Sequence, residues 1–200
     1  MKILFQGDSI TDASRDKSNM HDLGKGYASF AAKLLRDKFP EVDFEFINLG
    51  INGNRTEHLL ERLENDFIDI QPDIVSILVG VNDVHNATPD EYEERYCKVL
   101  TAIRERTNAK IMLLEPFVFP VNNMESVLHV DLDSMIRRVR KLAREFAEAL
   151  VPTDGLLASA YNNEDPTLYS RDGVHPTEYC AEYIGRVYAD YISDIIRSML

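Results

Sequence analysis

The amino-acid sequence predicts one α/β domain built around a parallel β-sheet. Short apolar runs alternate along the chain with long segments whose apolar residues recur with the 3.6-residue period of a helix. That alternation is typical of strands joined by crossover helices, the arrangement that produces a parallel sheet. The chain has 200 residues, the size of one ordinary domain, and contains no internal repeat, low-complexity tract or Gly/Ser-rich linker. We therefore expect residues 1–200 to form a single domain.

Five short apolar runs predict the strands, and five periodic segments predict the helices that follow them. The strands are expected, in chain order, at Lys2–Gln6, Phe44–Asn48, Ile74–Val79, Lys110–Leu114 and Ala149–Thr153. The helices are expected at Tyr27–Phe39, Thr56–Ile70, Pro89–Thr107, Ser126–Ala149 and Thr177–Met199.

Two of these helices carry further signals. Thr88 can cap the third helix, Pro89 suits its first position, and Glu91 completes a capping box. The fourth helix has the steadiest apolar stripe, and its basic opposite face is more typical of a solvated flank than of an anion site. The stripe comprises Leu132, Met135, Ile136, Val139, Leu142, Phe146 and Leu150, and the basic face comprises Arg137, Arg138, Lys141 and Arg144.

The net charge argues against several classes of partner. The chain has 22 Lys and Arg against 34 Asp and Glu, which gives a formal net charge of −12. Nucleic-acid binders and proteins that dock on anionic lipid normally present a basic face, so we expect neither activity. No apolar run approaches the length of a membrane-spanning helix, about 18 residues, so no membrane insertion is expected.

The cysteines and the first apolar run bear on cellular location. The apolar stretch Ile3–Phe5 is too short for the core of a signal peptide. Cys97 and Cys180 lie in predicted helices without metal-ligand spacing around them, as expected of free thiols in a reducing compartment. We therefore expect a cytoplasmic protein with no metal bound at its cysteines.

The first block of residues that can carry chemistry is Gly7-Asp8-Ser9-Ile10-Thr11, directly after the first predicted strand. A serine in a tight turn at the carboxyl end of a strand is exposed at the edge where open α/β sheets bind ligands. The block is not a G-x-S-x-G elbow, because Thr11 stands where that motif has its second glycine. Taken alone, Ser9 is better explained as a turn or helix-cap residue.

A serine nucleophile requires a base, and His175 is the best candidate among the five histidines. It lies in the run Arg171-Asp172-Gly173-Val174-His175-Pro176-Thr177, in which Asp172 precedes it by three residues. This spacing can place the carboxylate beside the imidazole, where it holds the tautomer and stabilises the cation formed on proton uptake. The other four histidines are more typical of surface or packing positions: His21, His58, His85 and His129.

Two further segments can supply donors for an oxyanion. The run Asn48-Leu49-Gly50-Ile51-Asn52-Gly53-Asn54 follows the second strand, and its glycines allow backbone N–H groups to approach a ligand closely. The run Gly80-Val81-Asn82-Asp83 follows the third strand and can direct the Asn82 amide to the same edge of the sheet. Glycine and asparagine also dominate ordinary turns, so the joint occurrence of these segments is the stronger signal.

Together, the four blocks resemble those of the SGNH, or GDSL-type, hydrolases, a family of esterases and lipases. The resemblance covers almost the whole chain and keeps the family's order of blocks. It implies a three-layer α/β/α sandwich whose five parallel strands have the flavodoxin-like order. It also implies hydrolysis of carboxylic esters with neither a metal nor an organic cofactor.

Position by position, the resemblance makes Ser9 the nucleophile, His175 the base and Asp172 the residue that orients the base. Gly53 is preferred to Gly50 as a backbone donor, because the family's donor is the glycine that ends the N-x-G/S-x-S/N-G stretch. The oxyanion hole that follows from the resemblance has three donors: the backbone N–H groups of Ser9 and Gly53 and the side chain of Asn82.

Some segments are similar to one branch of this family, the intracellular carbohydrate acetylesterases, which include acetylxylan esterases. These segments are the Asp12–Gly26 loop, Asn82-Asp83-Val84 and Glu115-Pro116-Phe117. We therefore expect a small-molecule ester substrate with a short acyl chain, above all an O-acetyl group on a carbohydrate. Contacts with the substrate are expected from Asp8, Asn54, Asp83, Phe117 and Val174.

Two alternatives stay open. Lysophospholipase-like and thioesterase members share the four blocks, and the side chains of residues 117–119 could line a channel for a longer acyl chain. A non-catalytic, flavodoxin-like module could instead bind a phosphate with the donors of the first three blocks. That second alternative would leave Asp172 and His175 without a role.

The last predicted helix suggests self-association. Its apolar and aromatic residues occupy more than one stripe, and tyrosine is enriched at protein interfaces. Core packing explains most of this pattern, and we expect the remainder to support a homo-oligomer. The tyrosines concerned are Tyr179, Tyr183, Tyr188 and Tyr191.

Overall fold

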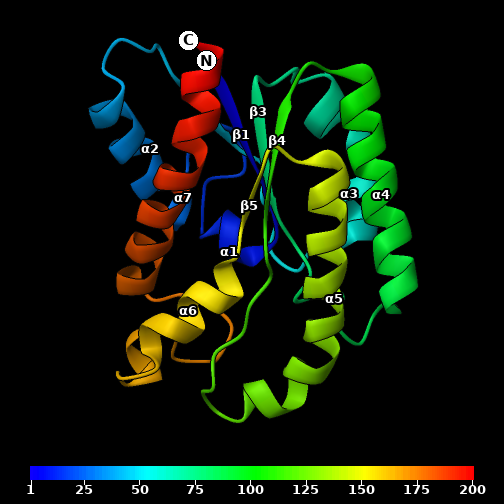
Figure 1. Cartoon of the computed structure of the whole chain (residues 1–200), viewed down its shortest axis with the longest axis vertical. Helices are drawn as coiled ribbons and strands as arrows, with labels where there is room; N and C mark the ends of the chain where they lie inside the picture. Colours follow the sequence, from blue (N-terminus) through cyan, green and yellow to red (C-terminus); the bar gives the residue numbers. More distant parts are fainter.

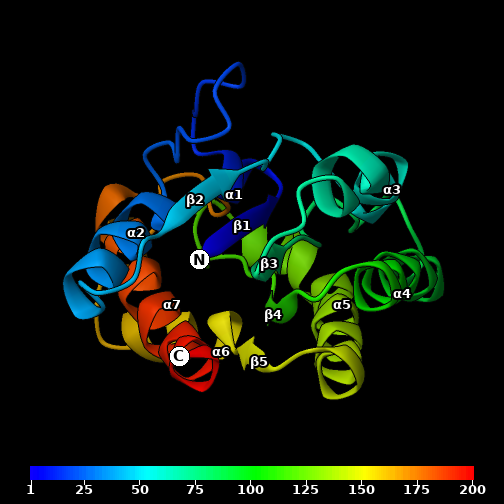
Figure 2. The ribbon, with the colours of Figure 1, turned by 90° about the horizontal axis from the view of Figure 1, so that it is seen from above.

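A five-stranded parallel sheet forms the middle layer of the molecule (Figures 1 and 2). The computed structural model describes the backbone of residues 1–200 and every side chain except those of residues 124–127, 129 and 130. All neighbouring strands are parallel, and their order is flavodoxin-like, so the predicted fold class is confirmed. The strands, in the spatial order β2-β1-β3-β4-β5, are β1 (Lys2–Gly7), β2 (Glu45–Asn48), β3 (Ile74–Leu78), β4 (Lys110–Leu114) and β5 (Ala149–Val151).

Helices cover both faces of this sheet, with α2 and α7 on one side and α3, α4 and α5 on the other (Figure 2). Successive residues of β1 alternate between the faces: Ile3 and Phe5 pack toward α2 and α7, and Leu4 packs toward the other three helices. The helices are α1 (Ser9–Asp12), α2 (Tyr27–Lys38), α3 (Thr56–Glu61), α4 (Pro89–Arg106), α5 (Met124–Phe146), α6 (Thr153–Tyr161) and α7 (Glu178–Met199).

The helix predicted at Thr56–Ile70 is interrupted. It consists of α3 followed by a π-helical turn at Glu64–Ile68. Between them lies Arg62, whose guanidinium donates to the Gln6 side chain of β1 at 3.0 Å and to the Leu49 carbonyl at 2.9 Å. These bonds tie the break in the helix to the edge of the sheet.

The region after β4 also differs from the prediction. The last strand is shorter than expected, because Pro152 has no N–H to donate to a neighbouring strand. Thr153 begins α6, which the sequence pattern did not predict, and neither α1 nor the 3₁₀ turn at Pro166–Leu168 was predicted. Leu150, expected at the end of the fourth helix, belongs to β5 instead.

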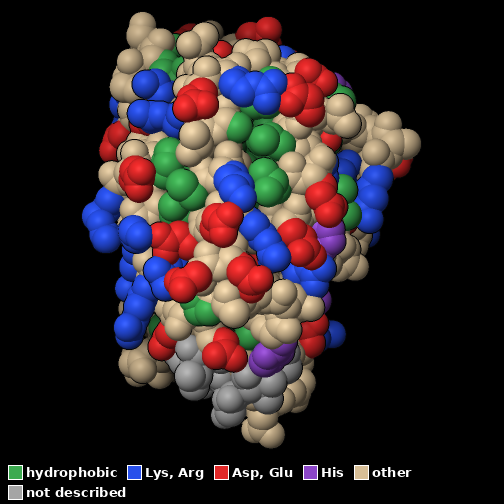
Figure 3. Space-filling model, turned by 90° about the vertical axis from the view of Figure 1, so that its right-hand side faces the viewer, with side chains coloured by type: hydrophobic (Ala, Val, Ile, Leu, Met, Phe, Trp, Pro, Cys, Tyr) green, Lys and Arg blue, Asp and Glu red, His purple; other side chains and the backbone are tan. Residues whose placement is uncertain are grey.

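The capping box of α4 is confirmed, since Thr88 Oγ1 accepts the Glu91 N–H at 3.3 Å and Glu91 Oε2 accepts the Thr88 N–H at 2.8 Å. On the neighbouring α5, Arg138 and Lys141 both pair with Glu93 of α4. Figure 3 shows acidic and basic side chains interspersed over this side of the molecule. This part of the basic flank is therefore neutralised by α4 and is no anion site.

The C-terminal helix α7 packs on α2 and buries much of its aromatic surface. Tyr188 is fully buried and donates to Ser76 Oγ of β3 at 3.1 Å, while Tyr183 is half-buried. Tyr179 and Tyr191 are 51% and 38% exposed, so these two tyrosines of α7 are open to a partner. In the part of the chain that the structure describes, no helix has the length and apolar character needed to cross a membrane.

The carboxyl ends of β1, β2 and β3 bring the first three blocks to one edge of the sheet. Gly7 makes the turn from β1 into α1 possible, because a Cβ there would lie only 2.2 Å from the Leu78 carbonyl oxygen of β3. The long segment between α1 and α2, residues 13–26, lies against the outer edge of β2. There the Asn48 N–H donates to the Met20 carbonyl at 2.8 Å.

Candidate active site

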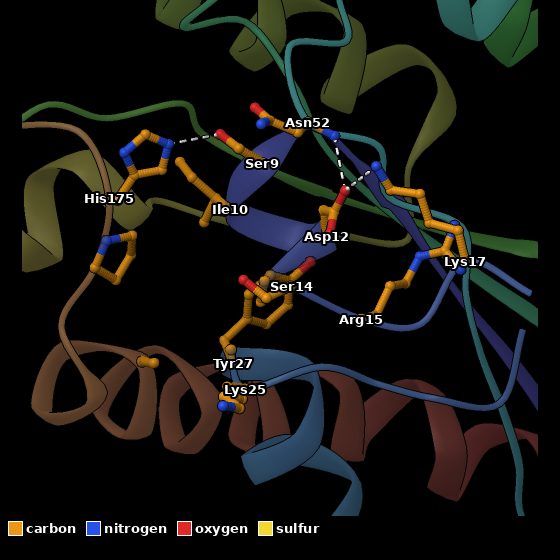
Figure 4. Close-up of a pocket in the computed structure, with 14 residues that line it drawn as sticks. Ser9, Ile10, Asp12, Ser14, Arg15, Lys17, Lys25, Tyr27, Asn52 and His175 are labelled. Atoms are coloured by element: carbon orange, nitrogen blue, oxygen red, sulfur yellow. Dashed lines mark hydrogen bonds and ion pairs between the residues drawn. The ribbon is translucent and has the colours of Figure 1, made fainter. Parts of the chain in front are cut away.

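Ser9 is the first residue of α1, directly after the turn at Gly7. His175 approaches it from the segment before α7, and its Nε2 lies 3.0 Å from Ser9 Oγ (Figure 4). On the other side of the imidazole, Nδ1 lies 2.6 Å from Oδ2 of Asp172. The three side chains thus make the contacts that a nucleophile, a base and an orienting carboxylate require.

A tight turn fixes the Asp172 carboxylate. Its Oδ1 accepts the N–H groups of Val174 at 2.9 Å and His175 at 2.8 Å, and the Ser170 hydroxyl donates to it at 3.2 Å. Partial burial acts to raise the Asp172 pKa, but hydrogen bonds from the His175 ring and the two amides outweigh it and hold this pKa well below its ordinary value. Asp172 is therefore an anion at neutral pH.

Three donors are available for an oxyanion. The N–H groups of Ser9 and Gly53 have no hydrogen-bond acceptor among the described residues. The N–H of Gly50, by contrast, donates at 2.9 Å to a side-chain oxygen of its own segment. Asn82 Nδ2 donates one hydrogen to the Asn54 carbonyl at 3.1 Å and keeps the other for a ligand. These bonds support Gly53 over Gly50 as the backbone donor.

The family model described as GDSL-like lipase/acylhydrolase matches residues 5–181, a range that contains all four blocks. The chain belongs to this family. The resemblance inferred from the motifs is confirmed, and with it the class of activity, hydrolysis of carboxylic esters.

Relatives of this GDSL-like esterase include an acetylxylan esterase from Geobacillus stearothermophilus, 30% identical over 88% of this chain and 86% of that protein. A multidomain esterase from Ruminococcus flavefaciens is 26% identical, over 99% of this chain but 29% of that protein. Among solved structures, a putative GDSL-like lipase from Parabacteroides merdae has a TM-score of 0.89 and 33% identity, covering 94% of both chains. The structure of Axe2, an acetylxylan esterase from G. stearothermophilus, has a TM-score of 0.85 and 29% identity, covering 94% of this chain and 92% of that one.

Two carboxyl groups of this GDSL-like esterase lie beneath the site rather than at its surface. Asp8 is 1% exposed, and its Oδ1 accepts the Ile10 N–H at 3.0 Å, which caps α1. Asp83 is fully buried and accepts the N–H and the hydroxyl of Thr56 at 3.1 and 2.6 Å. Burial raises the pKa of Asp8 to about 7 and that of Asp83 to about 6. The structure therefore corrects the expectation that these two residues contact substrate.

The other three residues expected to contact substrate are Phe117, Asn54 and Val174. Phe117 is fully buried, with its ring edge-to-face on Phe119 at a centroid distance of 5.5 Å, so its expected contact is also corrected. Asn54 is almost fully buried, and its Oδ1 accepts Arg62 Nε at 3.0 Å, which leaves it a structural role in its loop. Val174 is partly buried, next to His175 in the chain, and stays a proposed contact.

A pocket of about 540 Å³ opens beside Ser9 and His175 (Figure 4). One wall comes from the segment between α1 and α2, which contributes Arg15, Lys17 and Lys25. The volume is in the range of small-molecule sites. The length of this loop is visible in the sequence, but the role of its basic residues is not, because mixed charges in a polar loop are typical of solvated surface.

Proposed function

We propose that this protein is a serine esterase that removes O-acetyl groups from carbohydrates, or hydrolyses related short-chain esters, through an acyl-enzyme on Ser9. The observation that carries the proposal is the continuous contact from Ser9 Oγ through the His175 ring to Asp172. A serine hydroxyl is a weak nucleophile, and a base within hydrogen-bond reach activates it.

The reaction would proceed in two halves. Ser9 Oγ attacks the ester carbonyl carbon while His175 Nε2 accepts its proton, and Asp172 stabilises the resulting imidazolium. The tetrahedral oxyanion accepts hydrogen bonds from the Ser9 and Gly53 amides and the Asn82 side chain, each worth roughly 3 kcal/mol of transition-state stabilisation. His175 then returns the proton to the leaving alcohol. Water repeats the sequence on the acyl-enzyme and releases the acid.

The core favours a short acyl group over the longer chains of lysophospholipid or thioester substrates. An acyl channel was conceivable along Phe117, Val118 and Phe119, but all three side chains are buried in the hydrophobic core. A chain of many carbons would have to displace them, and close-packed interiors resist such displacement. An acetyl group requires no such space.

The relatives favour a carbohydrate as the alcohol half. The chain is 30% identical to an acetylxylan esterase over most of both proteins. The structure of such an enzyme also superimposes on this one with a TM-score of 0.85. These likenesses support acetylated carbohydrates as the substrate class.

The proposal is tested by initial rates on p-nitrophenyl esters from acetate to laurate, with wild type beside Ser9→Ala. We expect activity that is highest on acetate and absent from the variant. A maximum at longer chains would favour lipid or thioester substrates instead. Activity equal in wild type and variant, or absent from both, would overturn the serine mechanism and favour a binding module.

Two further properties are proposed, self-association and a cytoplasmic location. Tyr179 and Tyr191 are the exposed tyrosines of α7 and offer a surface for self-association, which light scattering across micromolar concentrations tests. A monomer throughout that range would contradict it. Cys97 and Cys180 are free thiols, as expected in the cytoplasm, and subcellular fractionation tests that location.

A further inference from the structure

Arg15 is a buried cation in the wall of the active-site pocket. The residue is only 7% exposed, and its Nε donates to the Gly50 carbonyl at 3.0 Å. Asp16 and Asp22 of the same loop attract the guanidinium electrostatically, but neither is close enough to form an ion pair with it. Nη1 is buried with no hydrogen-bond partner, and the guanidinium forms no ion pair with any carboxylate that the structure describes. Arginine is rarely so buried unless it is paired.

The lack of an ion pair is unexpected in so acidic a protein. The chain has 34 Asp and Glu against 22 Lys and Arg, so carboxylates are abundant. A buried charge that lacks a partner is strongly unfavourable, and a ligand that supplies the opposite charge removes that cost. The flat guanidinium offers paired donors that match a carboxylate or phosphate group.

Two lysines reinforce the positive charge of the same pocket (Figure 4). Lys17 lies 3.3 Å from Asp12 Oδ2 and is partly neutralised by it. Lys25 is exposed and forms no ion pair with the described residues. Three cations therefore face one carboxylate along the pocket wall, whereas the protein as a whole is strongly negative.

The wall that carries Arg15 is held by specific bonds. Ala13 and Ser14, immediately before it, have left-handed φ values of +44° and +63°, which non-glycine residues adopt only when their surroundings enforce them. The Lys25 N–H donates to the Ala13 carbonyl at 2.9 Å and closes the loop. Asn48 Nδ2 donates to the Leu23 carbonyl at 3.1 Å. The cation is therefore presented on a preformed surface.

The pocket lies on the side of the leaving group. Ser9 and His175 both line it, but the oxyanion donors Gly53 and Asn82 do not. In the proposed reaction His175 protonates the leaving alcohol, so the alcohol oxygen must lie within hydrogen-bond reach of its Nε2. The alcohol half of the ester is then the part that extends toward Arg15.

We propose that this pocket binds an alcohol that bears a negatively charged group, a carboxylate or a phosphate, and that this group pairs with Arg15 and Lys25. The inference rests on the proposed esterase function and narrows its substrate class from acetylated carbohydrates to acetylated anionic ones. A charge-assisted contact with Arg15 would both orient the ester and select it over neutral analogues.

The test compares two esters that differ in one charge, 3-acetoxybenzoate and its methyl ester. Both donate the same acetyl group and release phenols of similar acidity. We expect wild type to show a kcat/KM at least about tenfold higher for the anion, and we expect Arg15→Gln to bring this ratio close to one. Because the preference is electrostatic, it should also weaken with added sodium chloride.

Two further variants guard against a folding defect in Arg15→Gln. Lys25→Gln alters an exposed residue of the pocket and should lower the ratio in a protein that melts like wild type. Lys33→Gln removes the same charge from an exposed position of α2 outside the pocket and should keep the wild-type ratio.

Product inhibition then identifies the charged group. Glucuronate and glucose 6-phosphate are compared with glucose as inhibitors of p-nitrophenyl acetate hydrolysis, and stronger inhibition by either anion supports the proposal and names its chemistry. A ratio of one for the two acetoxybenzoates in an enzyme whose activity requires Ser9 would overturn this inference and leave the esterase intact. Absence of serine-dependent hydrolysis of either ester would overturn both.

Discussion

The Nε2 atom of His175 lies 3.0 Å from Oγ of Ser9, although 166 residues separate them in the chain. Ser9 follows β1 and His175 precedes α7, and the parallel sheet brings these two points to the same edge. The first prediction follows from this contact.

Ser9→Ala removes the nucleophile and should lower kcat for p-nitrophenyl acetate by a factor on the order of 10⁴ or more. The fold should be retained, because the Ser9 hydroxyl is partly exposed and, among the described residues, bonds only to the His175 ring. Rates and thermal melts measured together check both statements. Ser159→Ala, an exposed serine of α6, is the matched control and should be as active as wild type.

Asp172→Asn should lower kcat by roughly 10²–10⁴, less than the loss in Ser9→Ala. The amide can still accept the N–H groups of Val174 and His175, but it no longer offers a carboxylate to Nδ1 of the imidazole. Steady-state kinetics on the same ester provide the measurement. Wild-type kcat in this variant would mean that another residue orients His175.

Asn82→Ala should lower kcat by about 10²–10³ with little change in KM, since an oxyanion donor acts mainly in the transition state. The side chain also donates to the Asn54 carbonyl, so a purely structural role would appear instead as a lowered melting temperature with kcat nearly unchanged. Asn108→Ala, in an exposed position between α4 and β4, serves as the control.

Asp8→Asn should flatten the pH dependence of stability. The pKa of Asp8 is about 7 in the folded protein, against 3.8 as its ordinary value. Between these values the unfolded chain has released a proton that the folded chain retains, so the free energy of unfolding falls as pH rises from about 4 to about 7. The contribution of Asp8 is on the order of 4 kcal/mol, and asparagine removes it.

Urea unfolding at pH 4.5, 6 and 7.5 measures this effect. Asp37→Asn, an exposed substitution on α2, should keep the wild-type pH dependence. If Asp8→Asn and wild type lost stability in parallel over this range, the buried carboxyl would not be the source of the decline.

Much of the fold could be predicted because both faces of the sheet are covered, so each strand is a nearly continuous apolar run. The helix α6 was not predicted because it begins at Thr153, directly after β5 and Pro152. The periodicity of the apolar residues cannot separate a strand and a helix that lie so close together. Similarly, the break after α3 depends on where the Arg62 guanidinium finds its acceptors, which are distant in the sequence.

The candidate site also contains residues that could be predicted from the sequence and residues that could not. Asp172 and His175 were predictable as neighbours from their three-residue spacing, and Ser9 was grouped with them through the resemblance of the four blocks to the family. Phe117 was misjudged because an aromatic residue after a strand can face either a channel or the core, and only packing decides. The unpartnered Nη1 of Arg15 is likewise a property of the folded chain, since acidic residues lie near it in the sequence but none of those described forms an ion pair with it.

The segment of residues 13–26 also covers the exposed edge of β2. β2 is an outer strand, and outer strands tend to aggregate because their unpaired backbone groups can bond to another chain. The segment satisfies the Asn48 N–H through the Met20 carbonyl and places the His21 ring 3.1 Å from the Phe46 carbonyl. The loop that lines the pocket therefore also covers the edge strand of the sheet. Shortening the loop to widen the pocket would expose that strand and lower the solubility of the protein.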